Sequence, residues 1–228
     1  HPSSHRILTL SGLVTAPNKG APPQPPNQPA TRSGRAASLS ITPFRFKLLV
    51  YDLDGTLFET LPDLCTAVNL SLAAHDHPQK SLDEVRKAIG DGARILIARL
   101  VQPGSSDSEI DAVWETFRVE YLKVCADSSF LLPGVEEFLE SRRQDFPGRF
   151  QAILTNKPQA PSDALAVRFK MERWIGRVVG GDTPLGKKPE TGGLLDLMTW
   201  AGAAPEQTLM IGDGPADRRH VALEHGTV

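Results

Sequence analysis

Two aspartates flank a single leucine in the stretch VYDLDGTLFET, residues 50–60. Asp52 and Asp54 follow an apolar run and come just before a glycine. Packed carboxylates raise one another's pKa, whereas a hard cation such as Mg²⁺ takes oxygen ligands and lets them stay ionised. A carboxylate can also attack phosphorus, and a second one nearby can carry the proton of the leaving group. The stretch therefore indicates metal-assisted phosphoryl chemistry.

Further polar residues follow other apolar segments of the chain. They are Thr155 at the end of FQAILT with Asn156 and Lys157 after it, Lys187 and Lys188 before Pro189, and Asp213 with Asp217 after TLMIG. The carboxyl ends of parallel strands meet at one edge of a sheet, so these side chains are expected to converge there. Such a lysine and a threonine would hold transferring oxygens, and the Asp54-Gly55 turn would offer backbone N–H groups to them.

The elements that must position these residues alternate along the chain. Apolar, β-prone runs span residues 46–52, 150–155, 177–181 and 208–212, and helical patterns span 135–143, about 162–174, 190–201 and 216–225. Strands alternating with helices predict an α/β fold with a Rossmann-like, doubly wound parallel sheet. Gly192 and Gly193 read as interior glycines of the 190–201 helix and are expected to weaken it.

One segment interrupts the alternation. Between Leu61 and Leu132 we find no convincing strand, but SLDE at 81–84 and SDSE at 106–109 are typical capping boxes. The pattern predicts helices near 62–75, 82–89, 93–101 and 107–126. We therefore expect an α-helical cap at 59–132, inserted into a core of residues 44–58 and 133–228 and lying over the carboxyl edge of its sheet.

Composition bounds the remaining possibilities. Residues 1–43 are rich in Pro, Ser and Ala, so we expect a disordered extension, either a transit peptide or a mispredicted or cloned segment. A formal charge of −2 without a basic block argues against nucleic acid as a partner.

No apolar run is long enough to cross a membrane. Two distant cysteines favour a reducing compartment, so we expect a cytoplasmic protein, or an organellar one if the extension is a transit peptide.

The ordered set of motifs resembles a known family. DLDGT at 52–56, LTNK at 154–157, KKP at 187–189 and GDGPAD at 212–217 are similar to the four motifs of the haloacid dehalogenase superfamily. The helical insert resembles its class 1 cap. DLDGTLFETLPDL, IGDGARIL at 89–96 and VVGGDTPLGKKP resemble the phosphoglycolate phosphatase branch.

This resemblance implies a role for each matching residue. Asp52 would be the nucleophile and a metal ligand, and Asp54 would be the acid/base and bind metal through its carbonyl. Thr155 would contact phosphate, and Lys188, chosen over Lys187 because it precedes Pro189, would orient nucleophile and phosphate. The resemblance also implies Asp213 as a metal ligand with Asp217 behind it, and substrate contacts by Gly55, Thr56, Asn156, Gly92 and Arg94. Gly92 and Arg94 could instead simply break and restart a helix.

The expected activity is hydrolysis of a small phosphorylated metabolite, with Mg²⁺ as cofactor and 2-phosphoglycolate as the leading substrate. A phosphomutase of the β-phosphoglucomutase type and a non-catalytic protein of the same fold remain as alternatives. The family continues into a further strand after the region where this chain stops at Val228, so we expect a fragment. Oligomeric state is left open.

Overall fold

The structure is a computed structural model that describes residues 46–89, 92–145, 148, 150–214 and 217. The expected extension at 1–43 lies outside these residues, as does the expected helix at 216–225 apart from Asp217. The elements are, in chain order, β1 (Leu48–Tyr51), β2 (Phe58–Glu59), α1 (Leu61–Ala73), α2 (Leu82–Ala88), α3 (Ala93–Leu100), α4 (Asp107–Val124), β3 (Phe130–Leu131), α5 (Val135–Asp145), β4 (Phe150–Leu154), α6 (Gln159–Arg168), η2 (Met171–Arg173), β5 (Arg177–Val179), α7 (Gly192–Ala201), η3 (Pro205–Gln207) and β6 (Thr208–Ile211).

Four strands form the expected parallel sheet, in the order β5-β4-β1-β6. Leu48 pairs with Phe150 on one side and with Thr208 on the other, so the first strand lies inside the sheet. All three pairings are parallel. The predicted α/β class is confirmed, and the carboxyl ends of β1, β4 and β6 meet at one edge.

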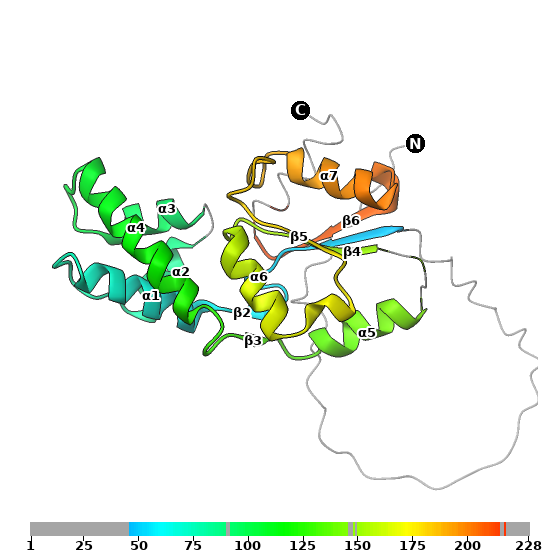
Figure 1. Cartoon of the computed structure of the whole chain (residues 1–228), viewed down its shortest axis with the longest axis horizontal. Helices are drawn as coiled ribbons and strands as arrows, with labels where there is room; N and C mark the ends of the chain where they lie inside the picture. Colours follow the sequence, from blue (N-terminus) through cyan, green and yellow to red (C-terminus); the bar gives the residue numbers. More distant parts are fainter. Residues whose placement is uncertain (1–45, 90–91, 146–147, 149, 215–216, 218–228) are drawn as a thin grey trace, which may run out of the picture.

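Helices cover both faces of this sheet (Figure 1). Because successive strand residues point to opposite faces, Leu48 and Val50 pack in one cluster with side chains of α7. Leu49 and Tyr51 pack in another cluster with side chains of α5 and α6. Each strand is therefore buried on both sides, which explains why its sequence is a continuous apolar run.

Helices α1 to α4 form a separate group beside the sheet, which we call the helical insert (Figure 1). It has its own apolar cluster, centred on residues such as Val68, Val113 and Phe117. Both predicted capping boxes are present, with Ser81 and Ser106 accepting hydrogen bonds from the backbone N–H three residues on. No helix among the described residues is both long and apolar enough to cross a bilayer.

The insert is joined to the sheet through a small antiparallel ladder, in which β2 pairs with β3. Our expectation of no strand between Leu61 and Leu132 was wrong, since β3 lies at Phe130–Leu131. Two residues are too few for the alternation that marks a strand in sequence. Next to this ladder, the buried carboxylate of Asp63 accepts hydrogen bonds from the Ser128 N–H at 2.8 Å and the Ser129 N–H and hydroxyl at 2.7 Å. Asp63 thus ties the two connections of the insert together.

Two helices of the core differ from their predicted ranges. The predicted 162–174 helix ends as α6 at Arg168, because Lys170 takes the left-handed conformation with φ of 53°. Gly192 and Gly193 are the first residues of α7 and not interior ones. A Cβ at Gly193 would lie 2.6 Å from Leu154 Cδ1, so this glycine lets α7 approach β4 closely. The expected weakening of an interior helix turn therefore does not apply.

Candidate active site

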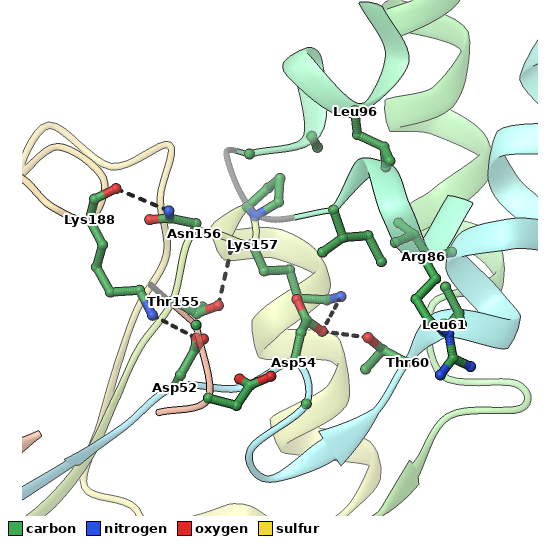
Figure 2. Close-up of a pocket in the computed structure, with 18 of the residues that line it drawn as sticks. Asp52, Asp54, Thr60, Leu61, Arg86, Leu96, Thr155, Asn156, Lys157 and Lys188 are labelled. Carbon is green, nitrogen blue, oxygen red and sulfur yellow. Dashed lines mark hydrogen bonds and ion pairs between the residues drawn. The ribbon is translucent and has the colours of Figure 1, made fainter. Parts of the chain in front are cut away.

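A pocket lies where the carboxyl ends of the strands face the helical insert, and its cavity volume is about 460 Å³ (Figure 2). Core residues and insert residues both line it. The charged lining residues are five acids, Asp52, Asp54, Glu59, Asp213 and Asp217, and three bases, Arg86, Lys157 and Lys188. This excess of acid favours a cation in the pocket before any anion enters.

Asp52 follows β1 and is held through one carboxylate oxygen. Its Oδ1 accepts from the Leu53 N–H at 2.7 Å and lies 2.8 Å from Lys188 Nζ. Among the described residues, no donor reaches Oδ2, so this oxygen is available to a ligand. Burial, together with the carboxylates of Asp217 and Asp54, raises the pKa of Asp52 to about 6, although the Lys188 ammonium opposes the rise.

Lys188 lies between two carboxylates. Its Nζ is 2.8 Å from Asp52 Oδ1 and donates to Asp217 Oδ1 at 2.6 Å, and its side chain is only 2% exposed. Burial alone would lower the pKa of Lys188, but these two acids raise it above its ordinary value. The ammonium is therefore charged and fixed at the base of the pocket.

Asp54 is held by a different pair of donors (Figure 2). Thr60 Oγ1 donates to Asp54 Oδ1 at 2.5 Å, and Lys157 Nζ donates to the same oxygen at 3.0 Å. Thr60 is the N-cap residue of α1, where a threonine hydroxyl usually accepts from the first helical turn. Here the Thr60 side chain makes no capping hydrogen bond. Its hydroxyl serves the Asp54 carboxylate instead of the helix.

A cluster of carboxylates could hold a divalent cation. Ligand oxygens of Asp52, Asp213 and Asp217 lie within 4.8 Å of one another. Oxygen donors of this kind suit Mg²⁺. Gly55 allows the cluster to form, because a Cβ at this position would lie 2.6 Å from Asp213 Oδ2. The residues present therefore fit a magnesium ion, although Asp217 also accepts from Lys188 and from the Gly214 N–H at 3.0 Å.

Magnesium binding is expected to weaken as the pH falls through about 6. A carboxylate must be ionised to bind a metal, and the pKa of Asp52 in the metal-free protein is raised to about 6. Protons therefore compete below this pH, and between pH 7 and pH 5 the apparent Mg²⁺ affinity should fall about tenfold. Thermal unfolding with increasing Mg²⁺ at each pH measures this effect. An affinity that stays constant over the range would contradict the assignment of Asp52 as a ligand.

Thr155 and Asn156 lie at the end of β4, as expected, and both line the pocket. The Thr155 N–H donates to the Val179 carbonyl at 3.0 Å, which fixes the strand end. Asn156 Nδ2 donates to the main-chain carbonyl of Lys188 at 3.0 Å, so this side chain holds the Lys188 loop against the strand. The buried Asn156 Oδ1 has no partner among the described residues.

The turn after Asp54 differs from the expectation that it offers its N–H groups to a phosphate. The Gly55 N–H donates to the Phe58 carbonyl at 2.8 Å, and the Thr56 N–H donates to the Leu53 carbonyl at 3.4 Å. Both groups are therefore used within the turn. The Thr56 hydroxyl donates to Asp213 Oδ1 at 3.1 Å, and Thr56 does not line the pocket. Gly55 lines it, but as a residue that makes room for Asp213.

Gly92 and Arg94 of the insert have different positions. Gly92 lines the pocket at the start of α3 with φ of 97°. Arg94 does not line it, and its guanidinium pairs with Asp111 of α4 at 2.6 Å. The structure therefore does not bring Arg94 into the pocket with the other predicted site residues, because its side chain joins α3 to α4. Arg86 of α2 lines the pocket instead, and no ion pair joins it to another described residue.

The sequence placed Lys157 at this edge of the sheet without giving it a role of its own, and it did not indicate Tyr121 or Thr60. Lys157 directly follows the predicted site residues Thr155 and Asn156, so its position in the sequence indicated that it lies near the site. Although burial alone would lower the pKa of Lys157, Asp54 and Tyr121 raise it above its ordinary value. Tyr121 reaches Lys157 from the helical insert, and no local pattern in the sequence indicates that contact.

Comparison with known proteins relates this arrangement to one family. The sequence model of the haloacid dehalogenase-like hydrolases matches residues 46–219. The phosphoglycolate phosphatase of Pseudomonas putida is 34% identical over 175 residues, covering 75% of this chain and 64% of that protein. The phosphoglycolate phosphatase of Pasteurella multocida is 36% identical over 180 residues, covering 76% of this chain and 80% of that protein. The chain thus spans less than two thirds of the length of its Pseudomonas putida relative.

Solved structures give the same result for the fold. A predicted phosphoglycolate phosphatase from Haemophilus somnus superposes with a TM-score of 0.72 at 30% identity, covering 80% of this chain and 83% of that one. A haloacid dehalogenase-like family hydrolase from Streptococcus pneumoniae superposes with a TM-score of 0.69 at 18% identity, covering 78% and 81%. The second similarity shows the fold alone.

Proposed function

Because this chain belongs to the haloacid dehalogenase-like hydrolase family, we propose that it is a Mg²⁺-dependent phosphatase that hydrolyses a small phosphomonoester through an aspartyl-phosphate on Asp52. One observation carries the proposal. Asp52 and Asp54 line one pocket, and each is anchored through Oδ1 by its own buried lysine. Two carboxylates that are held separately in this way can take two different roles.

Asp52 is the nucleophile in this proposal. Its Oδ2 attacks the phosphorus atom, the bond from phosphorus to the alcohol oxygen breaks, and the phosphoryl group is transferred to the carboxylate. Lys188 holds the attacking carboxylate by its other oxygen and brings positive charge to the base of the pocket. Thr155, which lines the same pocket at the end of β4, is placed to contact a phosphate oxygen.

Asp54 is the general acid and base in this proposal. In its neutral form it donates a proton to the departing alkoxide, and its carboxylate then takes a proton from the water that hydrolyses the aspartyl-phosphate. This step regenerates Asp52 and releases inorganic phosphate. The anchored Oδ1 of Asp54 leaves Oδ2 as the oxygen that exchanges the proton.

Asp52 and Asp213 would hold the magnesium ion, with the Asp54 carbonyl as a further ligand and Asp217 behind them. When bound, Mg²⁺ would supply positive charge that offsets the charge of the phosphate dianion. Five acids and three bases line the pocket, so without a bound cation its net negative charge would repel a phosphate.

We propose 2-phosphoglycolate as the substrate, because relatives with 34 to 36% identity are phosphoglycolate phosphatases. Arg86 supports this choice. It lines the side of the pocket formed by the helical insert, where a guanidinium can bind the carboxylate of the substrate through two hydrogen bonds (Figure 2). Apolar residues of the insert, including Leu64 and Leu96, leave little polar surface for a sugar.

A substrate panel tests the proposal. With Mg²⁺, the purified chain should release phosphate from 2-phosphoglycolate, and with excess chelator the release should stop. Arg86→Gln should raise KM for 2-phosphoglycolate by about tenfold, the cost of one charge-assisted contact. It should leave KM unchanged for an alkyl phosphate whose alkyl group carries no carboxylate. Conversion of a sugar 1-phosphate to its 6-phosphate without free phosphate would instead favour a phosphomutase. A folded chain with neither activity and no Mg²⁺-dependent thermal shift would favour a non-catalytic protein.

A further inference from the structure

We propose that Lys157 is a positioning residue for proton transfer by Asp54, and that Tyr121 of the helical insert completes its site. The inference rests on the proposed function, because it concerns the proton that the reaction must deliver. Lys157 follows β4 and is separate from the Lys188 group at the base of the pocket. Its side chain is 3% exposed, and its Nζ lies 3.0 Å from Asp54 Oδ1.

A lysine buried to this degree needs partners that replace water around its ammonium. Asp54 supplies the opposite charge. Tyr121 of α4 supplies the second contact, since Lys157 Nζ donates to the Tyr121 hydroxyl and lies 4.6 Å from the centre of its ring. One partner comes from the core and the other from the insert, so the ammonium is held only where these two parts of the chain meet.

Tyr121 is itself fixed within the insert. Its ring stacks on Phe117, with centroids 5.1 Å apart, and Phe117 stacks on Trp114 at 5.7 Å. The three aromatic side chains form a column along α4, and the column ends at the pocket, which Tyr121 lines. The hydroxyl of Tyr121 is thereby placed by the packing of the insert and not by the core.

The two donors to Asp54 determine which of its oxygens is free. Thr60 and Lys157 both bind Oδ1, and among the described residues no donor reaches Oδ2. A single donor would let the carboxylate turn about its bond to Cβ, whereas two donors on one oxygen fix its plane. Without Lys157 the carboxylate can turn, and Oδ2 is then misplaced for the leaving oxygen. Lys157 therefore acts on the proton transfer through Asp54 and need not touch the substrate.

Leaving groups of different basicity separate this role from a general loss of structure. An alkyl phosphate such as 2-phosphoglycolate expels an alkoxide that needs a proton, whereas 4-nitrophenyl phosphate expels a weakly basic phenolate that needs almost none. The kcat/KM of each substrate reports the steps up to departure of this group. Lys157→Met should lower kcat/KM on the alkyl phosphate by roughly 10- to 100-fold and on the aryl phosphate by less than about threefold.

Further variants keep the test decisive even where Lys157→Met folds poorly. Tyr121→Phe keeps the ring stack and removes the hydroxyl, so it should lower the alkyl-to-aryl ratio of kcat/KM in the same direction by about threefold or more. Lys157→Arg, which keeps the charge, should recover part of the ratio. Tyr51→Phe is a matched control, because the buried Tyr51 hydroxyl donates to Gln151 at 2.7 Å away from the pocket. It should leave the ratio unchanged.

The outcomes distinguish this inference from the proposed function. If Asp54→Asn lowers the alkyl-to-aryl ratio while Lys157→Met and Tyr121→Phe keep the wild-type ratio, the role of Lys157 is refuted and the phosphatase proposal stands. Equal losses on both substrates in Lys157→Met would also refute it, since they would indicate a structural role. If the wild-type chain hydrolyses neither substrate, or if Asp52→Asn is as active as the wild type, both proposals fail together.

Discussion

Phosphate release from 2-phosphoglycolate is expected to fall by a factor on the order of 10⁴ or more when Asp52 is replaced by asparagine. The neutral amide cannot form the phosphoryl bond that the proposed mechanism requires. Asparagine is close to aspartate in shape, so the fold should persist and the loss should appear in kcat. Initial rates of phosphate release at saturating Mg²⁺, with protein concentration raised to the limit of detection, measure the residual activity.

The same variant makes a prediction about stability. The folded-state pKa of Asp52 is raised to about 6, so the folded metal-free protein favours the neutral carboxyl. For such a group, the stabilising contribution is complete at low pH and is lost as the pH rises through about 6. Asp52→Asn is neutral at every pH, and in chelator its melting temperature should exceed that of the wild type by a few degrees at pH 7.5.

Measurement at a second pH supplies the control. At pH 5 most wild-type molecules carry a protonated Asp52, so the difference in melting temperature should shrink. A variant that is inactive because it has unfolded would melt lower than the wild type at both values. An active Asp52→Asn variant with the same rate as the wild type would remove Asp52 from the mechanism altogether.

Lys188→Met should combine a large loss of activity with a large loss of stability. Lys188 is the shared counter-ion of Asp52 and Asp217 and is almost fully buried. Methionine keeps much of the volume but leaves the buried Asp217 and the partly buried Asp52 carboxylates without a counter-ion, which costs about 3–5 kcal/mol of unfolding free energy near neutral pH. In the proposed mechanism Lys188 orients the nucleophile, so loss of its charge should lower kcat by roughly 10³-fold. Urea unfolding and initial rates measure the two effects.

The stability loss of Lys188→Met should depend on pH. At pH 5 Asp52 is largely protonated and needs no counter-ion, so the destabilisation should be smaller than at pH 7.5. In the Asp52→Asn background, the loss caused by Lys188→Met should be smaller than in the wild type, because one of the two carboxylates that need the ammonium is already neutral. The neighbouring Lys187 does not line the pocket, and Lys187→Met should keep most of the activity and stability. Similar effects at both lysines would contradict the choice of Lys188.

The sequence predicted the sheet and most of the pocket because both follow from local patterns. Strands buried on both faces are continuous apolar runs, and parallel strands bring their carboxyl ends together. Asp52 and Thr155 follow such runs directly, so their meeting could be anticipated. The capping boxes at Ser81 and Ser106 are likewise signals contained within four residues.

Other features depend on tertiary contacts that leave no local pattern. Lys157 and Tyr121 meet although one belongs to the core and the other to the insert. The sequence does not distinguish Arg86 from Arg94, since both are arginines of the helical insert. Only the packing of α3 against α4 brings Arg94 next to Asp111. Likewise, the Gly55 N–H donates to the Phe58 carbonyl, and the sequence alone does not indicate this hydrogen bond.

The position of β1 within the sheet also affects the order in which the chain can fold during synthesis. β1 leaves the ribosome before every other described element, yet Leu48 pairs with Phe150 and Thr208, which emerge much later. Until then both edges of this apolar strand lack partners, a state that favours pairing with other chains. The helical insert contacts mainly itself and can bury its own core early. The nascent chain can therefore form the insert side of the pocket before the strands that carry Asp52, Thr155 and Asp213 pair with one another.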